Sequence, residues 1–116
     1  KIIKEAYIAA DKLADEGVEC EIIDLRTIRP LDYDAIFDSV KKTNRLVILE
    51  EAWPFGNIST DISHTVQSKL FDYLDAPVEK VNNADTPTPY SPVLLKEWLP
   101  DSNDVYKAVK KVLYLK

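Results

Sequence analysis

Two adjacent acids and two nearby arginines are the residues whose types could support chemistry. Glu50 and Glu51 follow an apolar run and could work as a general acid and a general base. Because neighbouring side chains at a strand end point to opposite faces, we expect one of them to make a structural or interface bond and neither to catalyse. Arg26 and Arg29 could hold an anionic ligand, but the aspartates beside them favour structural or intersubunit ion pairs.

Other reactive residues are scarce. The chain has one histidine, one cysteine and two glycines, so it lacks the residues for a cysteine-based metal site, an internal disulfide or a glycine-rich phosphate loop. His64 lies opposite the apolar stripe of its predicted helix, and we expect it at the surface. Cys20 is expected to fill the core from a strand face. We therefore predict no catalytic, cofactor-binding or metal-binding residue within the chain.

Composition narrows the class of protein. With 116 residues the chain has the usual size of one domain, and residues 1–116 are taken as a single domain. Its net charge of −5 argues against binding to the phosphate backbone of nucleic acids. No apolar run approaches the roughly 20 residues that a membrane span needs. The expectation is a globular protein with neither a nucleic acid nor a membrane as its partner.

Hydrophobic spacing predicts alternating helices and strands. The first helix ends at Gly17, and because no capping residue precedes it we expect a fragment of a longer protein. A strand is predicted over 18–25, a helix capped by Asp32 follows, and Leu46–Leu49 is a buried strand. The remaining expected elements are a helix from Ile58 to Leu74, a strand over Val78–Val81, an irregular segment over 82–100, and a helix capped by Asp101 or Ser102.

This order predicts an α/β fold, a three-layer α/β/α sandwich with a mostly parallel sheet. Crossover helices must cover both faces of such a sheet. Ligands and partners of these sheets bind beyond the carboxyl ends of the strands. The loops over 26–32, 50–57 and 82–93 are predicted to leave from that edge.

Two proline-containing stretches stiffen one part of this chain. Asp75-Ala76-Pro77 and the run from Asp85 to Tyr90 flank a short apolar strand. Proline fixes its own φ and holds the preceding residue extended, so the loops are shaped and exposed. In a chain without an active-site signature, such loops indicate a docking surface.

Several of these motifs, in order, resemble a known family. They are Asp24–Asp32, Lys42–Arg45, Glu50–Phe55, and Leu74–Pro77 with the run from Asp85 to Tyr90. Together they resemble the C-terminal, transketolase-like domain of the beta subunit of thiamine-diphosphate-dependent pyruvate dehydrogenase, from about Ala6 to Leu115. The branched-chain 2-oxo acid dehydrogenase is the alternative within the same family, and a self-standing interaction domain is the alternative outside it.

The resemblance implies a role in assembly. In that family thiamine diphosphate and magnesium are held by other parts of the enzyme, so this chain alone would not catalyse. Its partners would be a second beta subunit, the alpha subunit, and the subunit-binding domain of dihydrolipoyl acetyltransferase. The compartment would be the bacterial cytoplasm or the mitochondrial matrix.

The resemblance also assigns residues. Asp75 falls where the family presents an acid to the basic subunit-binding domain, and Leu115 lies in the same docking patch. Asp75 could instead only cap its own turn. Candidates for the subunit interface are Arg26, Arg29, Trp53 and Phe55, although a loop tryptophan can also act as a lid over the core.

Overall fold

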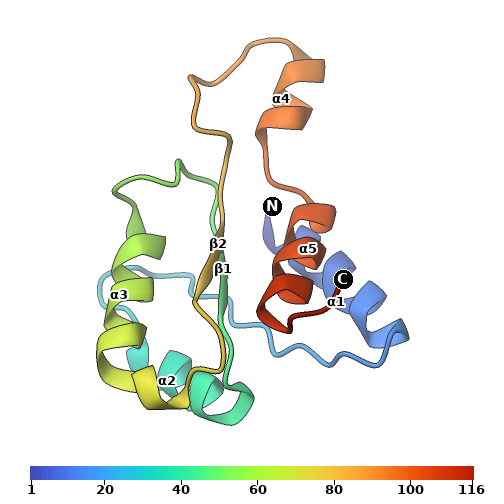
Figure 1. The fold of residues 1–116 in the computed structure, drawn as a ribbon. Coiled ribbons are helices and arrows are strands. Elements are labelled where there is room, and N and C mark those ends of the chain that lie inside the picture. Colours follow the sequence, from blue (N-terminus) through green and yellow to red (C-terminus); the bar gives the residue numbers. More distant parts are fainter.

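A two-stranded parallel sheet lies between two pairs of helices (Figure 1). The computed structural model describes all residues, 1–116. The elements in chain order are α1 (Ile3–Asp15), α2 (Tyr33–Thr43), β1 (Val47–Leu49), α3 (Ile58–Leu70), a 3₁₀ turn η1 (Phe71–Tyr73), β2 (Glu79–Val81), α4 (Pro92–Trp98) and α5 (Ser102–Val112).

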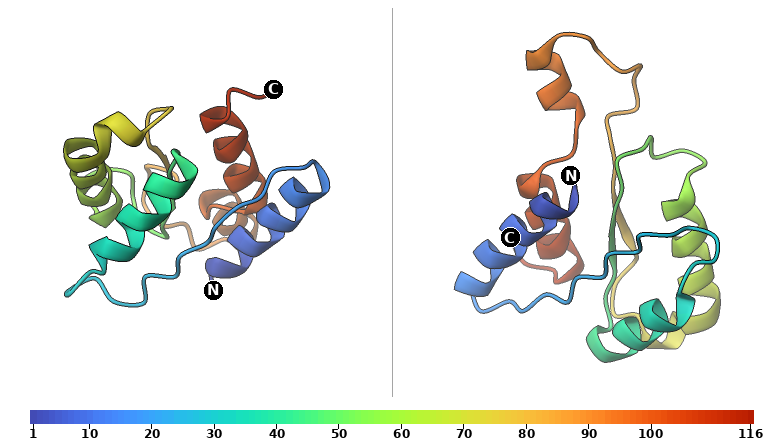
Figure 2. Two further views of the ribbon diagram at one scale, coloured as in Figure 1. Left: turned by 90° about the horizontal axis from the view of Figure 1, so that it is seen from below. Right: turned by 180° about the vertical axis from the view of Figure 1, so that it is seen from behind.

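The sheet confirms the predicted fold class. β1 and β2 run parallel, with Val47 opposite Glu79 and Leu49 opposite Val81. The pair α1 and α5 lies on one side of the strands, and the pair α2 and α3 lies on the other, as the views in Figures 1 and 2 agree. The chain is therefore an α/β protein with three layers.

Two apolar clusters fill the spaces between the layers. The larger joins α2 and α3 to β1, and its buried members are Ile36, Val40, Ile48, Ile62, Val66 and Leu70. The smaller joins α1, β2 and α5 through Ala9, Val81 and Val105. Since the three residues of β1 send side chains to both faces, this short strand contributes to both clusters.

The helices begin and end at residues suited to those positions. The Asp32 carboxylate accepts from the Ala35 amide at 3.1 Å, and Asp101 forms a capping box with Asp104, so both predicted caps are confirmed. Asn44 ends α2 with a left-handed φ of 64°. The third helix was predicted to reach Leu74, but it ends at Leu70 and continues only as a 3₁₀ turn.

The predicted strand over 18–25 is wrong. The backbone hydrogen bonds of residues 18–26 are local ones, from the Val18 amide to the Leu13 carbonyl and from the Thr27 amide to the Leu25 carbonyl, and this stretch crosses the domain as an irregular chain without pairing to β1. It lines a cavity of about 890 Å³, together with β1 and parts of α1 and α5. The alternating apolar residues mark a segment with one face turned inward, but only a hydrogen-bonded neighbour makes such a segment a strand.

The segment over 82–100 also differs from its prediction, because it contains helix α4. Pro92 occupies a first-turn position of α4, where its missing N–H costs nothing. No residue of α4 is buried, and the helix stands away from the sheet and the other helices (Figures 1 and 2). Ser91 and Pro92 at its start are typical of loops, and seven residues are too few to show an apolar periodicity, so the sequence did not predict this helix.

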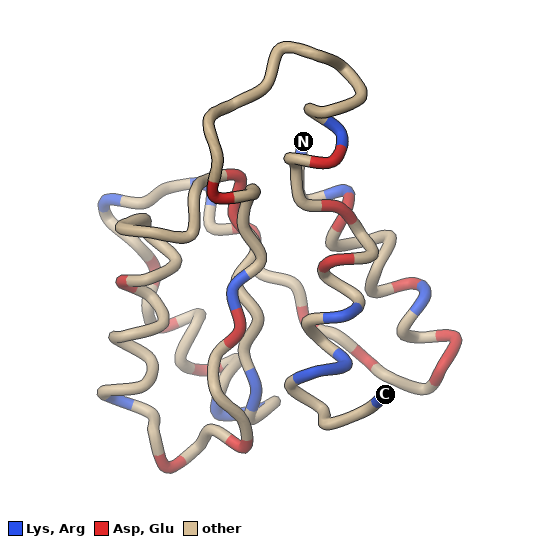
Figure 3. Tube along the Cα trace, turned by 45° about the horizontal axis from the view of Figure 1, so that its top comes forward, with Lys and Arg blue, Asp and Glu red and all other residues tan.

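The charged residues of this chain are spread along its whole length. Acidic and basic positions are mixed along the trace, with no long stretch of basic residues only (Figure 3). No helix combines enough length and apolarity to cross a bilayer. The surface features that remain are local ones, at loops and helix ends.

Candidate docking surface

Asp75 lies between η1 and β2 with its carboxylate turned outward. Its side chain is 58% exposed, and its charged partner is Arg45, whose Nη1 lies 3.7 Å from Oδ2. The Asp75 amide donates to the Asn44 carbonyl at 2.8 Å, so the backbone is fixed although the side chain is open. The carboxylate makes no hydrogen bond to its own turn, and the turn-capping alternative has no support in the geometry.

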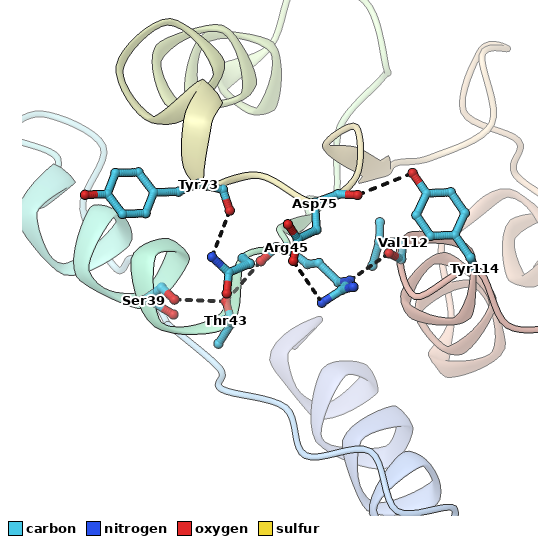
Figure 4. A network of polar contacts seen from close by, with 8 residues as sticks. Ser39, Thr43, Arg45, Tyr73, Asp75, Val112 and Tyr114 are labelled. Carbon is cyan, nitrogen blue, oxygen red and sulfur yellow. Dashed lines mark hydrogen bonds and ion pairs between the residues drawn. The ribbon is translucent and has the colours of Figure 1, made fainter.

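The end of the chain lies beside Asp75. Tyr114 has a left-handed φ of 56°, and its hydroxyl donates to the Asp75 carbonyl at 3.5 Å (Figure 4). Leu115 is 48% exposed, and its amide donates to the Lys110 carbonyl at 2.9 Å. The structure thus brings the neighbour of Leu115 into contact with Asp75, although 39 positions separate Tyr114 from Asp75 in the sequence.

Arg45 is the residue of this surface that the sequence prediction missed. Its Nε donates to the Val112 carbonyl at 3.0 Å, so it contacts both the Asp75 loop and the end of α5 (Figure 4). The signal available in the sequence was a cation placed directly before a buried strand. We use the name docking surface for Arg45, Asp75 and residues 113–116.

The four interface candidates lie in two other loops. Arg26 is paired with Asp24 at 3.3 Å, as the ion-pair interpretation predicted, but its side chain is 84% exposed. Arg29 is also exposed. Trp53 is half exposed and Phe55 almost wholly so, which leaves apolar surface on the loop after β1. Whether these residues meet a partner stays a prediction.

A shared acceptor joins the loops that leave β1 and β2. The Nε1 atoms of Trp53 and Trp98 both donate to the Thr86 carbonyl, each at 3.0 Å. Two of the three loops predicted at the carboxyl edge of the sheet therefore touch there. Trp53 thus links the loop after β1 to the loop after β2, and its side chain is still half exposed.

Glu50 has a structural role, as the sequence analysis expected for one of the two adjacent acids. Its Oε1 accepts from Ser59 Oγ at 2.6 Å and from Asn82 Nδ2 at 3.0 Å, which joins the end of β1 to α3 and to the loop after β2. Glu51 is exposed. The two acids do not converge on a common point as an acid and base pair must.

The remaining reactive residues do not form a site. His64 is exposed and lies 3.4 Å from the Ser68 hydroxyl, which confirms its surface position. No three His, Cys, Asp or Glu side chains lie together in a way that could hold a metal ion. The geometry therefore suits binding through an exposed acid and apolar loops.

Cys20 is half-buried, and its environment predicts a slow reaction. Burial raises the pKa of the Cys20 thiol above its ordinary value, and the Glu19 charge raises this pKa further. Since only the thiolate attacks, we expect alkylation to start at higher pH than for an unfolded thiol. Iodoacetamide rates against pH test this, with the urea-unfolded chain as reference. Equal midpoints in the folded and unfolded chain contradict the prediction, and Glu19→Gln is expected to lower the folded midpoint.

The sequence is similar to those of known proteins over nearly its whole length. Residues 1–105 match the family model described as "Transketolase, C-terminal domain". The pyruvate dehydrogenase E1 component subunit beta of Rickettsia felis is 52% identical over 112 residues, covering 97% of this chain and 34% of that protein. The acetoin:2,6-dichlorophenolindophenol oxidoreductase subunit beta of Bacillus subtilis is 43% identical over 113 residues, covering 97% of this chain and 33% of that protein.

A solved structure gives the same result for the fold. The structure titled "Split gene transketolase, inactive beta4 tetramer" superposes with a TM-score of 0.79 at 27% identity. The match covers 97% of this chain and 35% of the other. The chain thus spans about a third of the length of the curated relatives it matches.

Proposed function

Because the chain belongs to the family of transketolase C-terminal domains, we propose that it is the assembly domain of a pyruvate dehydrogenase beta subunit. The whole enzyme would decarboxylate pyruvate and pass the acetyl group to the lipoyl group of dihydrolipoyl acetyltransferase. In this proposal the chain joins a second beta subunit and the alpha subunit, and it docks the basic subunit-binding domain of the acetyltransferase. The relatives' names support the enzyme, and the docking surface supports the role within it.

The cofactor would belong to other parts of that enzyme. The chain offers no group of side chains for magnesium, and its two glycines lie in open turns, where no atom comes within 4 Å of the position that a Cβ would take. These residues do not fit a site for thiamine diphosphate, so we assign it to the subunit regions that this chain does not span. Since relatives include bacterial and mitochondrial proteins, we propose the bacterial cytoplasm or the mitochondrial matrix as its location.

The observation that carries the docking proposal is the exposed Asp75 carboxylate beside the end of α5. An acid that is fixed by its backbone and open at its side chain can receive a Lys or Arg from a partner. Arg45 leaves most of the acceptor positions of this carboxylate free because the contact is long, at 3.7 Å. Charge complementarity of this kind supports fast and salt-sensitive association.

Substituting Asp75 tests this proposal. We expect Asp75→Asn in the complete enzyme to weaken binding to the isolated subunit-binding domain about tenfold, because one half-exposed charge pair is lost. Calorimetry at low and at physiological salt measures the effect, and the wild type should lose affinity as salt rises. Asp61→Asn, in the first turn of α3 at the far end of that helix from Asp75, removes the same charge and should leave binding unchanged.

Two results would contradict the docking role. One is the absence of wild-type binding at low salt, which would favour a self-standing interaction domain with another partner. The other is equal binding by Asp75→Asn and the wild type. Turnover of pyruvate, 2-oxoisovalerate and acetoin by the complete enzyme then distinguishes pyruvate dehydrogenase from the branched-chain enzyme and from the acetoin enzyme that one relative's name describes.

A further inference from the structure

Arg45 is anchored by the end of a helix. Its Nε donates to the carbonyl of Val112, the last residue of α5, at 3.0 Å. The last carbonyls of a helix have no partner within the helix and carry partial negative charge, so a guanidinium is well placed there. The side chain of Arg45 is 31% exposed, which holds the contact partly out of water.

The same guanidinium reaches the Asp75 loop, and the contacts close a ring. Nη1 of Arg45 lies 3.7 Å from Asp75 Oδ2, the Asp75 amide donates to the Asn44 carbonyl, and the Tyr114 hydroxyl donates to the Asp75 carbonyl (Figure 4). The ring returns through the backbone from Tyr114 to Val112. Two segments that are distant in the sequence are thereby held at one separation.

We propose that Arg45 is a positioning residue of the docking surface, which fixes the end of α5 against the Asp75 loop so that both meet a basic partner as one surface. This inference rests on the proposed docking function and adds to it a residue that need not touch the partner. It gives Arg45 a role that its charge alone would not suggest.

The charge of Arg45 and its position in the structure predict opposite changes in docking affinity when Arg45 is substituted. A cation beside Asp75 lowers the negative potential that attracts a basic domain, so by charge alone its removal would tighten docking. By position, its removal leaves the long Tyr114 hydroxyl bond as the remaining tie between the chain end and the Asp75 loop, so residues 113–116 move more freely and the partner must order them on binding. The direction of the change therefore separates the two interpretations.

The experiment compares Arg45→Gln and Arg45→Lys in the complete enzyme. We expect Arg45→Gln to dock the isolated subunit-binding domain about 5- to 10-fold more weakly, mainly through faster dissociation. Arg45→Lys keeps the charge but can reach only one of the two partners, so it should recover part of the loss. Lys42→Gln is the matched control, because it removes one cation from a pair with Glu21 at 3.0 Å and should change docking less than twofold.

A double-mutant cycle with Asp75→Asn and hydrogen exchange complete the test. If Arg45 acts through Asp75, the two substitutions together should cost less than the sum of their separate effects. In the absence of the subunit-binding domain, the amides of residues 113–116 should exchange faster in Arg45→Gln than in the wild type.

Each contrary result has its own meaning. Equal or tighter docking by Arg45→Gln, or unchanged exchange at 113–116, overturns the role of Arg45 while the docking function stands. Full additivity with Asp75→Asn does the same. No docking by the wild-type enzyme overturns the docking function itself, and this proposal with it.

Discussion

Leu13→Ala is expected to destabilise the chain by about 3 kcal/mol, because it removes buried methyl groups and leaves a cavity where α1 meets α5. Leu13 is the largest side chain that is fully buried, at 0% exposure. Polar contacts tie α1 to α5 near both ends of α1: the Ser102 amide donates to Glu5 at 2.8 Å, and the Tyr106 hydroxyl donates to Glu16 at 2.8 Å. These contacts limit how far the helices can close around the lost volume.

Urea denaturation followed by circular dichroism at 222 nm measures this loss as a lower midpoint. Ile8→Ala is the matched control, since Ile8 lies on the same helix but is 55% exposed, and it should change the free energy of unfolding by less than about 0.5 kcal/mol. A loss below about 1 kcal/mol for Leu13→Ala would show that α1 contributes little to the stability of the domain.

Glu50→Ala should destabilise the chain by about 2 to 3 kcal/mol, because one substitution removes the acceptor of several donors. Glu50 Oε1 accepts from the hydroxyl of Ser59, which is 0% exposed, and from the amide of Asn82. The Ser59 backbone amide at the start of α3 lies 3.4 Å away, so the carboxylate also faces the positive end of that helix. Without Glu50 these donors lose their hydrogen-bond acceptor while they stay partly or wholly buried.

The same urea experiment tests Glu50, with Glu50→Gln and Glu51→Ala as companions. Glu50→Gln keeps one acceptor oxygen and should lose about half as much stability. Glu51→Ala replaces the neighbouring acid, which is exposed, and should stay within about 0.5 kcal/mol of the wild type. Similar losses for Glu50→Ala and Glu51→Ala would contradict the structural role of Glu50.

Local signals in the sequence predicted the helices well and the sheet less well. Asp32 and Asp101 cap their helices because a cap needs only residues nearby in the chain. The strand predicted over 18–25 failed, since pairing depends on a neighbour that periodicity cannot identify. Helix α4 was missed because proline and serine mask so short a helix.

The docking surface shows the same division between local and distant information. Asp75 was predicted as a docking residue from its own loop and from the family resemblance, and its side chain is exposed as docking would require. Arg45 was not, because its partners, Val112 and Asp75, lie 67 and 30 positions away in the sequence. Contacts over such separations are decided by how α5 packs beside β1, which a single sequence does not reveal.

The carbonyl of Thr86 bears on the tryptophan fluorescence of the chain. It accepts from both indoles of this chain, Trp53 and Trp98, so the two tryptophan fluorophores of the chain lie around one atom. A partner that draws the 82–98 segment aside changes the polarity around both rings at once. The fluorescence of this chain therefore reports the movement of this segment without an attached dye.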